Sequence, residues 1–595
     1  MKGRNSVIGK IVNIDNNFVD IELDKNISID SIKALINYHV VFDNGTIKVV
    51  GEVISVRTDS ASINLIGEIS NGIFYSGISK KPFFGSSCRY ITLEEISIII
   101  GSKSGEKTIN IGRMPQYDGY KVNVSTSGFF SNHIAILGNT GSGKSYGLTR
   151  ILQNLFIDPN SIPKKSNLFI FDAYGEYHSA FSFLNGDSET HFKIFTTKIS
   201  KFENVNEELL RIPLWLLDVD DYALLLGATS VTQLPIIEKA LKLVGVFCKE
   251  EKDVIVYKND IIARALLEIM YSGGTPNQTR DQILAVLNTF NTSELNLDTK
   301  VVVPGWIRTL RQCLLIDKDG KLSEIQLVTQ FLQSYVKEGL ELSLPDGSFS
   351  YNLKHLEDAF NFAFISEGLL KNNKVYEEAN VLRVRLHTLA NSDNRHLFIY
   401  EQFVNKEQFI NGLINVKAGG RAQIINFNIS HVDDRLAKTI VKLLSKMLFE
   451  YGVSIEDRGA FPVHLIIEEA HRYVQKDSDL DIIGYNIFER IAKEGRKYGT
   501  ILVLMSQRPS EISETAISQC SNFLMYRMQH PKDLNYVKEM IPNISEDTMN
   551  KFKLLQPGTC IAFGVAFKIP ILLRMDLPNP PPYSQNANIN KYWYE

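Results

Sequence analysis

A glycine-rich stretch about a quarter of the way along the chain constrains the fold more than any other feature. Residues 138–145 read Gly-Asn-Thr-Gly-Ser-Gly-Lys-Ser, which matches the pattern G-x-x-x-x-G-K-S. An apolar run at 133–137 precedes the stretch, and residues 146–157 follow with apolar side chains at helical spacing. A strand, a glycine loop and a helix in this order form a Walker A phosphate-binding loop. The stretch therefore predicts a nucleotide-binding α/β domain.

The chemistry of such a loop assigns roles to its residues. Backbone N–H groups approach the phosphates where glycine leaves room, and the helix N-terminus adds partial positive charge. We expect Lys144 to contact the β- and γ-phosphates and the Ser145 hydroxyl to ligate Mg²⁺. The cofactors predicted are ATP and Mg²⁺. The residues expected to bind the nucleotide are Gly138, Asn139, Thr140, Gly141, Ser142, Gly143, Lys144, Ser145 and Tyr146.

Hydrolysis requires a second, acidic strand, and the chain has one candidate. Residues 463–467 are mostly apolar, as in a strand buried on both faces, and Glu468 and Glu469 follow them. Such a strand delivers its carboxylates to the edge of the sheet where ligands bind. We expect Glu468 to hold Mg²⁺ through water and Glu469 to act as general base. The first acid is usually Asp, and Glu468 is one methylene longer.

Two further polar residues follow core strands. Asp172 comes directly after the apolar run 168–171 and is expected beside the phosphate loop, either as a cofactor-binding acid or as an ordinary strand-end residue. Gln507 comes after the apolar strand 500–505, where it is placed to sense the γ-phosphate or to orient water.

Residues 482–497 have the spacing of one helix, with Gly499 as its C-terminal stop. Its basic residues form either a solvated face or a source of an arginine for the γ-phosphate of an adjacent subunit. Arg490 and Arg496 are about 120° apart at roughly 100° per residue, so at most one is expected to take this role. Arg490 has Glu494 one turn later as an alternative partner.

The pattern of strands and helices predicts the domain organisation. Short β-rich runs with an Asn44-Gly45 hairpin signal indicate a closed barrel at the N-terminus, and apolar strands alternate with helices from about residue 105. The predicted core strands are 133–137, 168–171, 423–427, 463–467, 500–505, 523–526 and 559–565. The expected segments are a barrel over 1–100, the nucleotide-binding core over 101–214 and 416–577, a helical insertion over 215–415, and a proline-rich, aromatic tail over 578–595.

Composition narrows the functional classes. The net charge is −3, which argues against a protein coated in nucleic acid but leaves room for a narrow basic channel. The five cysteines contain no C-x-x-C pair, so no zinc site is expected, and their scatter suits a reducing cytoplasm. No apolar run approaches the length of a membrane span. The tail, with Tyr592, Trp593 and Tyr594, is expected either to be disordered or to dock on a neighbouring subunit.

Together these motifs resemble the HerA family within the HerA/FtsK group of DNA-translocating ATPases. The resemblance is carried by 138–145, 172–177, 391–398, 468–471 and 494–499, and by Ser506-Gln507-Arg508-Pro509, in this order. It covers nearly the whole chain. The departures are Glu468 in place of Asp, and Ala173-Tyr174 where the family often has Pro-His.

The resemblance implies a RecA-like core, a homo-hexamer with ATP at subunit junctions, and double-stranded DNA through the centre of the ring. It also implies a partner docked on the barrel: a NurA-type nuclease in DNA end processing, or a sirtuin-like NADase or another nuclease in anti-phage defence. One alternative is a ring scaffold that ATP switches and that assembles an effector with little DNA movement. Another is a conjugation or secretion ATPase, a class that usually has membrane helices or membrane partners.

Overall fold

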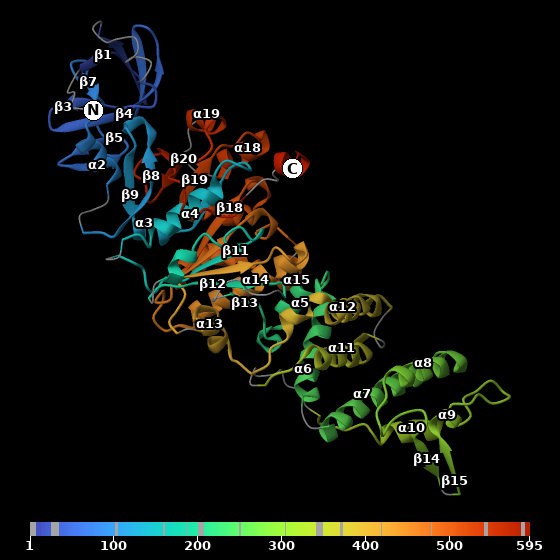
Figure 1. Ribbon diagram of the computed structural model, residues 1–595. Helices are drawn as coiled ribbons and strands as arrows, with labels where there is room; N and C mark the ends of the chain where they lie inside the picture. The colour runs from blue at the N-terminus through green and yellow to red at the C-terminus, as the bar shows by residue number, and fades with distance from the viewer. Residues whose placement is uncertain are drawn as a thin grey trace.

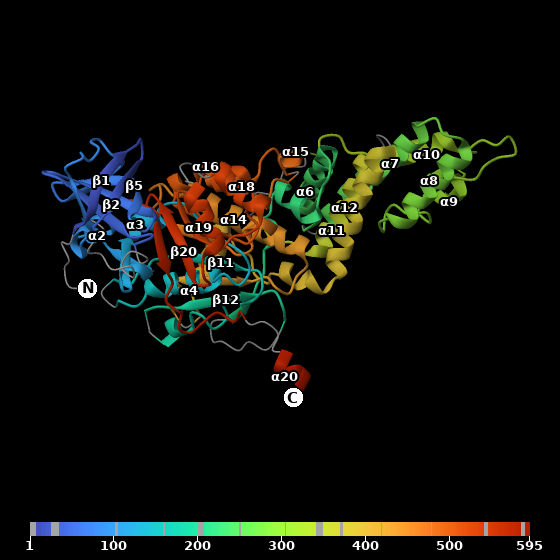
Figure 2. The same ribbon diagram turned by 90° about the horizontal axis from the view of Figure 1, so that it is seen from above.

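The computed structural model divides the molecule into three units arranged in a row (Figure 1). The N-terminal barrel lies at one end, the large mixed sheet in the middle, and a helical arm at the other end, and the view from above shows the same order (Figure 2). The structure describes residues 7–24, 35–101, 105–158, 161–186, 189–199, 207–248, 251–303, 305–340, 349–368, 373–417, 419–477, 479–540, 546–584 and 589–594.

The barrel is closed by the pairing of β2 with β5. Six strands follow one another in the order β2, β1, β7, β3, β4 and β5, and β2 pairs with β5 to complete the circle, while β6 extends the sheet beyond β5. Gly45, with φ 71°, makes the predicted hairpin turn between β3 and β4. The elements are β1 Val7–Ile14, β2 Phe18–Leu23, β3 His39–Asn44, β4 Ile47–Val56, β5 Ser60–Ser70, β6 Ile73–Ser76, β7 Ser87–Tyr90 and α2 Leu93–Ile100.

A buried ionic cluster joins the barrel wall to α2. Arg89 on β7 donates hydrogen bonds of 2.8 and 2.9 Å to the two oxygens of Glu95, and another of 2.8 Å to Asp43. Lys48 contacts Glu95 at 2.8 Å, and Glu95 also accepts from the Thr92 amide in a capping box. Burial alone would raise the pKa of Glu95, but these donors outweigh it and hold the pKa at about 2. Every charge in this cluster therefore has a partner.

The core is one twelve-stranded sheet. The first eight strands, in the order β13, β12, β16, β11, β17, β18, β10 and β19, run parallel, and the last four, β20, β21, β8 and β9, are antiparallel. The strands are β8 Thr108–Met114, β9 Tyr120–Ser125, β10 Ile134–Leu137, β11 Leu168–Asp172, β12 Phe192–Thr196, β13 Glu207–Leu209, β16 Ile424–Asn428, β17 Val463–Ile467, β18 Thr500–Ser506, β19 Asn522–Tyr526, β20 Thr559–Gly564 and β21 Ile571–Arg574.

Both faces of the parallel strands are covered. On β10, Ala135 and Leu137 join one apolar cluster, whereas Ile134 and Ile136 join the other, as expected when alternate side chains point to opposite faces. The helices of this unit are α3 Thr126–Phe130, α4 Lys144–Asn154, α14 Asp434–Ser454, α15 Asp479–Ile483, α16 Ile487–Glu494, α17 Glu514–Ser518, α18 Pro531–Met540 and α19 Glu546–Leu554. All seven strands that the sequence predicts in the core are present, within one or two residues of their expected ends.

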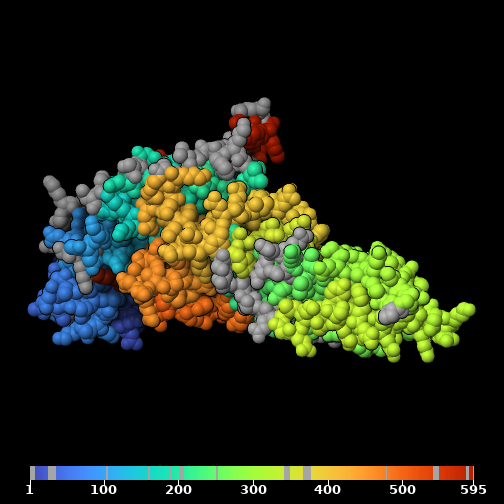
Figure 3. Space-filling model, turned by 90° about the horizontal axis from the view of Figure 1, so that it is seen from below, coloured from blue at the N-terminus to red at the C-terminus, as the bar shows by residue number. Residues whose placement is uncertain are grey.

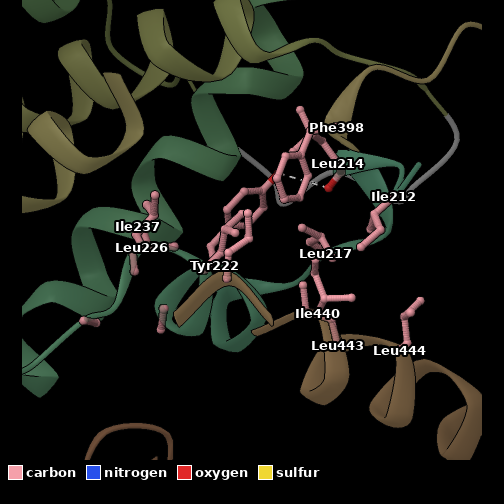
Figure 4. Packing of buried hydrophobic residues seen from close by; sticks show 14 of the residues in the cluster. Ile212, Leu214, Leu217, Tyr222, Leu226, Ile237, Phe398, Ile440, Leu443 and Leu444 are labelled. Atoms are coloured by element: carbon pink, nitrogen blue, oxygen red, sulfur yellow. Dashed lines mark hydrogen bonds between the residues drawn. The ribbon is translucent and has the colours of Figure 1, made fainter. Parts of the chain in front are cut away.

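The helical arm grows out of the core between β13 and β16. Its elements are α5 Val219–Leu226, α6 Leu234–Phe247, α7 Glu251–Tyr271, α8 Pro276–Thr289, α9 Leu310–Cys313, α10 Ile325–Gln333, α11 Leu353–Gly368, α12 Asn373–Asn391, α13 Lys406–Ile414, and the hairpin of β14 Lys300–Val303 and β15 Trp306–Thr309. At its base, Leu217 and Tyr222 pack close to Ile440 and Leu443 of α14 (Figure 4). Arm and core therefore share one continuous apolar cluster.

The C-terminal segment returns along the core. Residues 575–584 have neither helix nor strand, in keeping with the prolines there, and α20 Ile589–Tyr594 stands away from the rest of the molecule (Figure 3). Tyr592 and Trp593 are 75% and 73% exposed, so in a single chain these aromatic side chains are not packed against its own surface.

Candidate ATP site

The phosphate loop lies between β10 and α4, at the carboxyl edge of the parallel strands. Three of its glycines have positive φ, with values of 154° at Gly138, 70° at Gly141 and 103° at Gly143. Lys144 is the first residue of α4, and its Nζ donates to the carbonyls of Gly138 at 2.8 Å and Asn139 at 3.0 Å. Its ammonium group therefore lies inside the loop, where a phosphate would replace the carbonyl oxygens as its partner.

The neighbouring strand β19 fixes the position of this loop. A Cβ on Gly138 would lie 2.6 Å from Cβ of Tyr526, and one on Gly143 would lie 2.9 Å from the backbone nitrogen of Gly558. The same steric limit extends into α4, because a Cβ on Gly147 would collide with the Tyr526 hydroxyl. Gly558 also donates its N–H to the Ser142 carbonyl at 2.9 Å. The loop is thus clamped between its own helix and the β19–β20 side of the sheet.

The two acids after β17 have different environments. Glu468 is only 3% exposed, accepts hydrogen bonds from the Ala173 amide at 3.2 Å and the Tyr177 hydroxyl at 3.4 Å, and has a pKa raised well above its usual value by burial and by Asp172. Glu469 has φ 47° and ψ 46°, a left-handed conformation that costs a non-glycine residue about 1 kcal/mol. This turn separates the side chains of Glu468 and Glu469. Glu469 therefore points towards Gln507 and not towards the residues that contact Glu468.

Gln507 joins the phosphate loop to the second acid. The Thr140 hydroxyl donates to its Oε1, and its Nε2 donates to Oε1 of Glu469 at 3.3 Å. The other oxygen, Oε2 of Glu469, is buried and makes no hydrogen bond to any residue that the structure describes, although Nδ1 of His471 lies 3.3 Å away. Burial raises the pKa of Glu469, while Lys144 and Arg472 lower it. A carboxylate with one oxygen fixed and the other unsatisfied is suited to accept a proton from a water molecule.

Asp172 has a structural role that the sequence did not show. Its Oδ1 accepts from the amides of Gly175 at 2.7 Å and Glu176 at 3.0 Å, and its Oδ2 from the amide of Tyr177 at 3.1 Å and from Asn426 at 3.1 Å. Both oxygens therefore organise the turn after β11. In the sheet, β17 and β18 separate β11 from β10, so a place for Asp172 beside the phosphate loop and a direct part in cofactor binding both stay predictions.

The site carries more negative than positive charge. Burial lowers the pKa of Lys144, whereas Glu469, Glu468 and Glu176 raise it. Among the residues that the structure describes, no three His, Cys, Asp or Glu side chains form a group able to hold a metal ion by themselves. Mg²⁺ commonly binds through one or two protein groups, water and the substrate phosphates. The excess of carboxylates and the unsatisfied Oε2 of Glu469 fit such an ion, with Ser145 and Glu468 as the residues that would hold it.

The expected helix over 482–497 is wrong. Residues 484–486 interrupt it: Gly484 has φ 82°, and the Asn486 side chain caps a new helix, α16, by accepting from the amides of Phe488 and Glu489. A 3-10 helix over Gly495–Tyr498 then replaces the last turn. Arg490 and Arg496 therefore belong to different elements, and the angle of about 120° between them does not apply.

The two arginines also differ in their contacts. Nε of Arg490 lies 3.6 Å from Glu494, as anticipated, and its guanidinium packs 5.4 Å from the ring centre of Phe449. The Arg496 side chain is exposed, and its guanidinium has no hydrogen bond or ion pair within the described residues. It lies just before the first residue of β18, whereas Gln507 follows the last. About 20 Å of strand separates it from the carboxyl edge.

One residue near the site was missed by the sequence interpretation. Glu176 lies four residues after Asp172, and its carboxylate lies beside the side chains of Ser145 and Ser584. Its Oε2 is buried and unpartnered. The available signal was an acid in the turn that follows a strand ending at the phosphate-loop edge.

The family model described as "Helicase HerA, central domain" matches residues 109–327. A probable helicase of Methanocaldococcus jannaschii is 24% identical over 516 residues, which is 87% of this chain and 79% of the relative. The DNA double-strand break repair helicase HerA of Sulfurisphaera tokodaii is 32% identical over 178 residues, and the match spans 29% of this chain and about a third (35%) of that helicase. None of the helices in the described part of the chain has both the length and the apolar character needed to span a bilayer.

Among solved structures, the plasmid coupling protein TrwB in complex with ADP and Mg²⁺ matches this chain. It matches with a TM-score of 0.41 and 12% identity, over 82% of this chain and 92% of TrwB. The structure of VirB4 of Thermoanaerobacter pseudethanolicus matches with a TM-score of 0.40 and 14% identity, over 80% of this chain and 98% of VirB4.

Proposed function

Because this chain is a HerA/FtsK-type P-loop ATPase, we propose that it uses ATP hydrolysis to move along double-stranded DNA as one subunit of a six-membered ring. The main support for this proposal is that the chain has both a complete phosphate loop and a strand followed by two acids, Glu468 and Glu469. In addition, a probable helicase aligns with 87% of the chain. The geometry of the site supports ATP hydrolysis, and the names of the relatives support movement along DNA.

In this proposal, each polar side chain of the site has one task. Lys144 leaves the carbonyls of Gly138 and Asn139 to neutralise the β- and γ-phosphates. Ser145 and Glu468 would hold Mg²⁺, the latter through water, and the ion would supply charge to offset that of the phosphates. Glu469 accepts a proton from the attacking water. Gln507, held between Thr140 and Glu469, keeps that carboxylate aligned with the loop.

A neighbouring subunit completes the site with Arg496. The supporting observation is its position at the amino edge of the parallel strands, about 20 Å from its own phosphate loop. An exposed guanidinium there is out of reach of the nucleotide in the same chain but available to another one. Arginine supplied in this way stabilises the charge that develops on the transferred phosphoryl group. Arg490 is the weaker candidate, because Glu494 and Phe449 already engage it.

Mixed rings test the arginine in trans. Arg496→Ala subunits and Lys144→Ala subunits should each be inactive alone, whereas mixtures should regain ATPase activity at junctions where an intact loop meets an intact arginine. Mixing is checked by native mass spectrometry. If confirmed mixtures stay inactive, Arg496 does not act in trans, and the same experiment is repeated with Arg490→Ala.

DNA-stimulated ATPase activity tests the DNA half of the proposal. We expect duplex DNA to raise the ATPase rate with little dependence on its sequence, and DNA affinity to fall steeply between low and moderate salt. A rate that does not change with saturating DNA would contradict the proposal. The control is the Lys144→Ala protein, which should bind DNA without turnover.

The barrel is proposed to dock a separate effector enzyme, a nuclease or NADase, in DNA end processing or anti-phage defence. It exposes several large apolar side chains on β6 and in the loop before β7: Ile73, Tyr75, Phe83 and Phe84. Exposed apolar groups of this kind commonly mark protein interfaces. They also favour the second candidate, in which the ring mainly assembles and switches this effector. ATPase activity that responds to the effector and not to DNA would select that candidate.

A further inference from the structure

The C-terminal segment is fastened to the core beside the nucleotide site. We define the strap as residues 578–584. Its first attachment is Gln153, a residue of α4 only 2% exposed, which accepts from the Asn579 amide at 2.9 Å and donates to the Pro580 carbonyl at 2.8 Å. Since α4 begins at Lys144, the strap is anchored on the helix that carries the phosphate loop.

The second attachment is the turn after β11. The Tyr583 amide donates to the Glu176 carbonyl at 2.7 Å, and the Ser584 side chain lies beside the Glu176 carboxylate. The amide of Glu176 is in turn held by Asp172 at 3.0 Å. The strap and Asp172, at the end of β11, therefore both hold the backbone of Glu176.

The Glu176 carboxylate is only partly satisfied. Its Oε2 is buried and has no hydrogen-bond partner within the described residues. Buried carboxylate oxygens are nearly always paired, so this one calls for a partner that arrives with a ligand. The Glu176 side chain also lies beside that of Ser145, the residue expected to ligate Mg²⁺.

We propose that Glu176 belongs to the shell of the Mg²⁺–nucleotide complex on the side of Ser145, and that the strap is the positioning element that holds it there. The inference rests on the ATPase site and is independent of DNA movement. The strap would have this positioning role because it connects two elements of the site, α4 and the turn after β11. By linkage, a strap that favours binding of the Mg²⁺–nucleotide complex must itself be stabilised by that complex.

The first test measures binding of a fluorescent, non-hydrolysable ATP analogue to the full chain, with Mg²⁺ or with EDTA and without DNA. Glu176→Gln should weaken binding about tenfold in Mg²⁺ and by less than about twofold in EDTA, since a charged partner is lost only when the ion is present. Ser584→Ala should weaken binding in Mg²⁺ about threefold, and Ser584→Thr, which keeps the hydroxyl, should restore it. Ser518→Ala, on the exposed side of α17, is the matched control.

The second test follows the strap itself by hydrogen exchange. The amides of Asn579 and Tyr583 should exchange more slowly when the analogue and Mg²⁺ are both present, and not with the analogue in EDTA. The proposal is overturned if Ser584→Ala behaves like Ser518→Ala, if Glu176→Gln weakens binding equally in EDTA, or if exchange in the strap ignores Mg²⁺. Because neither test contains DNA, their outcome does not depend on the proposed translocase function.

Discussion

The barrel and the nucleotide site both bury carboxylates, but they treat them in opposite ways. In the barrel, Arg89, Lys48 and the Thr92 amide surround Glu95 and hold its pKa at about 2 against the effect of burial. In the core, Glu468 lies among Asp172, Glu176 and Glu469, and its pKa is raised well above the usual value, first by burial and then by these acids. The charges around Glu95 are balanced by other residues of the barrel. The acids around Glu468 outnumber the cations near them, which fits binding of a metal ion.

This difference separates a structural charge from a functional one. A buried ion pair that is complete contributes to a unique fold, whereas removal of one partner leaves an uncompensated charge. The nucleotide site has more carboxylates than cations among its own residues, which fits binding of Mg²⁺ together with the phosphates. Substitutions in the two clusters should therefore have different consequences: loss of stability in the barrel, and loss of catalysis in the core.

The largest effect is expected from Lys144→Ala. This change removes the one ammonium group inside the phosphate loop, and ATPase activity should fall by at least about 1000-fold. Steady-state phosphate release measures the activity, and urea unfolding should show stability close to that of the unchanged protein. Appreciable turnover would mean that another cation neutralises the phosphates.

Glu469→Gln should be nearly as damaging to turnover while sparing nucleotide binding. The amide keeps the shape of the side chain but cannot accept a proton, so kcat should drop about 10²–10⁴-fold. Nucleotide retention after gel filtration should persist. Unchanged kcat would exclude Glu469 as the base and shift attention to its neighbour Glu468.

Glu95→Gln should destabilise the barrel by about 2 kcal/mol, because Arg89 loses its buried carboxylate and keeps Asp43 and the Tyr90 carbonyl as acceptors. Limited proteolysis in urea, with fragments identified by mass spectrometry, should show earlier cleavage within residues 7–101. Intrinsic nucleotide binding by the core should not change. A loss of binding of the same size as the loss of stability would show that the two clusters are coupled.

The barrel cluster also predicts a pH dependence. Since the folded pKa of Glu95, about 2, lies below its ordinary value of 4.5, its ionised form contributes stability that is complete above about pH 4.5 and is lost as pH falls towards 2. The difference in stability between the unchanged protein and Glu95→Gln should therefore shrink over this window. Proteolysis by pepsin, which acts at acid pH, measures it, and a constant difference would contradict the assignment.

Gln507→Ala should have the smallest effect, about a tenfold lower kcat with little change in KM, because it removes alignment of Glu469 and no charge. Thr140→Val provides the matched variant on the other side of the same bridge and should be milder still. A larger effect of Thr140→Val than of Gln507→Ala would show that the loop itself, and not the bridge, sets the position of the base.

The sequence predicted what depends on local pattern. Gly138 to Ser145 and the apolar strand before Glu468 are each contained in one short stretch, and the structure places them at one edge of the sheet as expected. The bridge from Thr140 to Gln507 spans 367 positions, so only the folded chain reveals it. The strap on Glu176 was hidden for the same reason.

The mistaken helix over 482–497 was a different kind of error. Its apolar spacing is genuine, and Ile487 and Ile491 are buried as expected. The break is signalled by Gly484, which needs a positive φ, and by Asn486, a strong N-cap residue. The apolar periodicity predicted one continuous helix, whereas Gly484 and Asn486 already indicated a break in it.

The contact between Gly147 and Tyr526 has a consequence for how this chain can change in evolution. The recognised phosphate-loop pattern ends at Ser145, but any side chain on Gly147 would occupy the space of the Tyr526 hydroxyl. These two positions lie in different strand–helix units, and the collision involves the hydroxyl of Tyr526, which has no hydrogen-bond partner among the described residues. Loss of that hydroxyl is therefore expected to come before any side chain at Gly147, so changes at the two positions should occur in a fixed order.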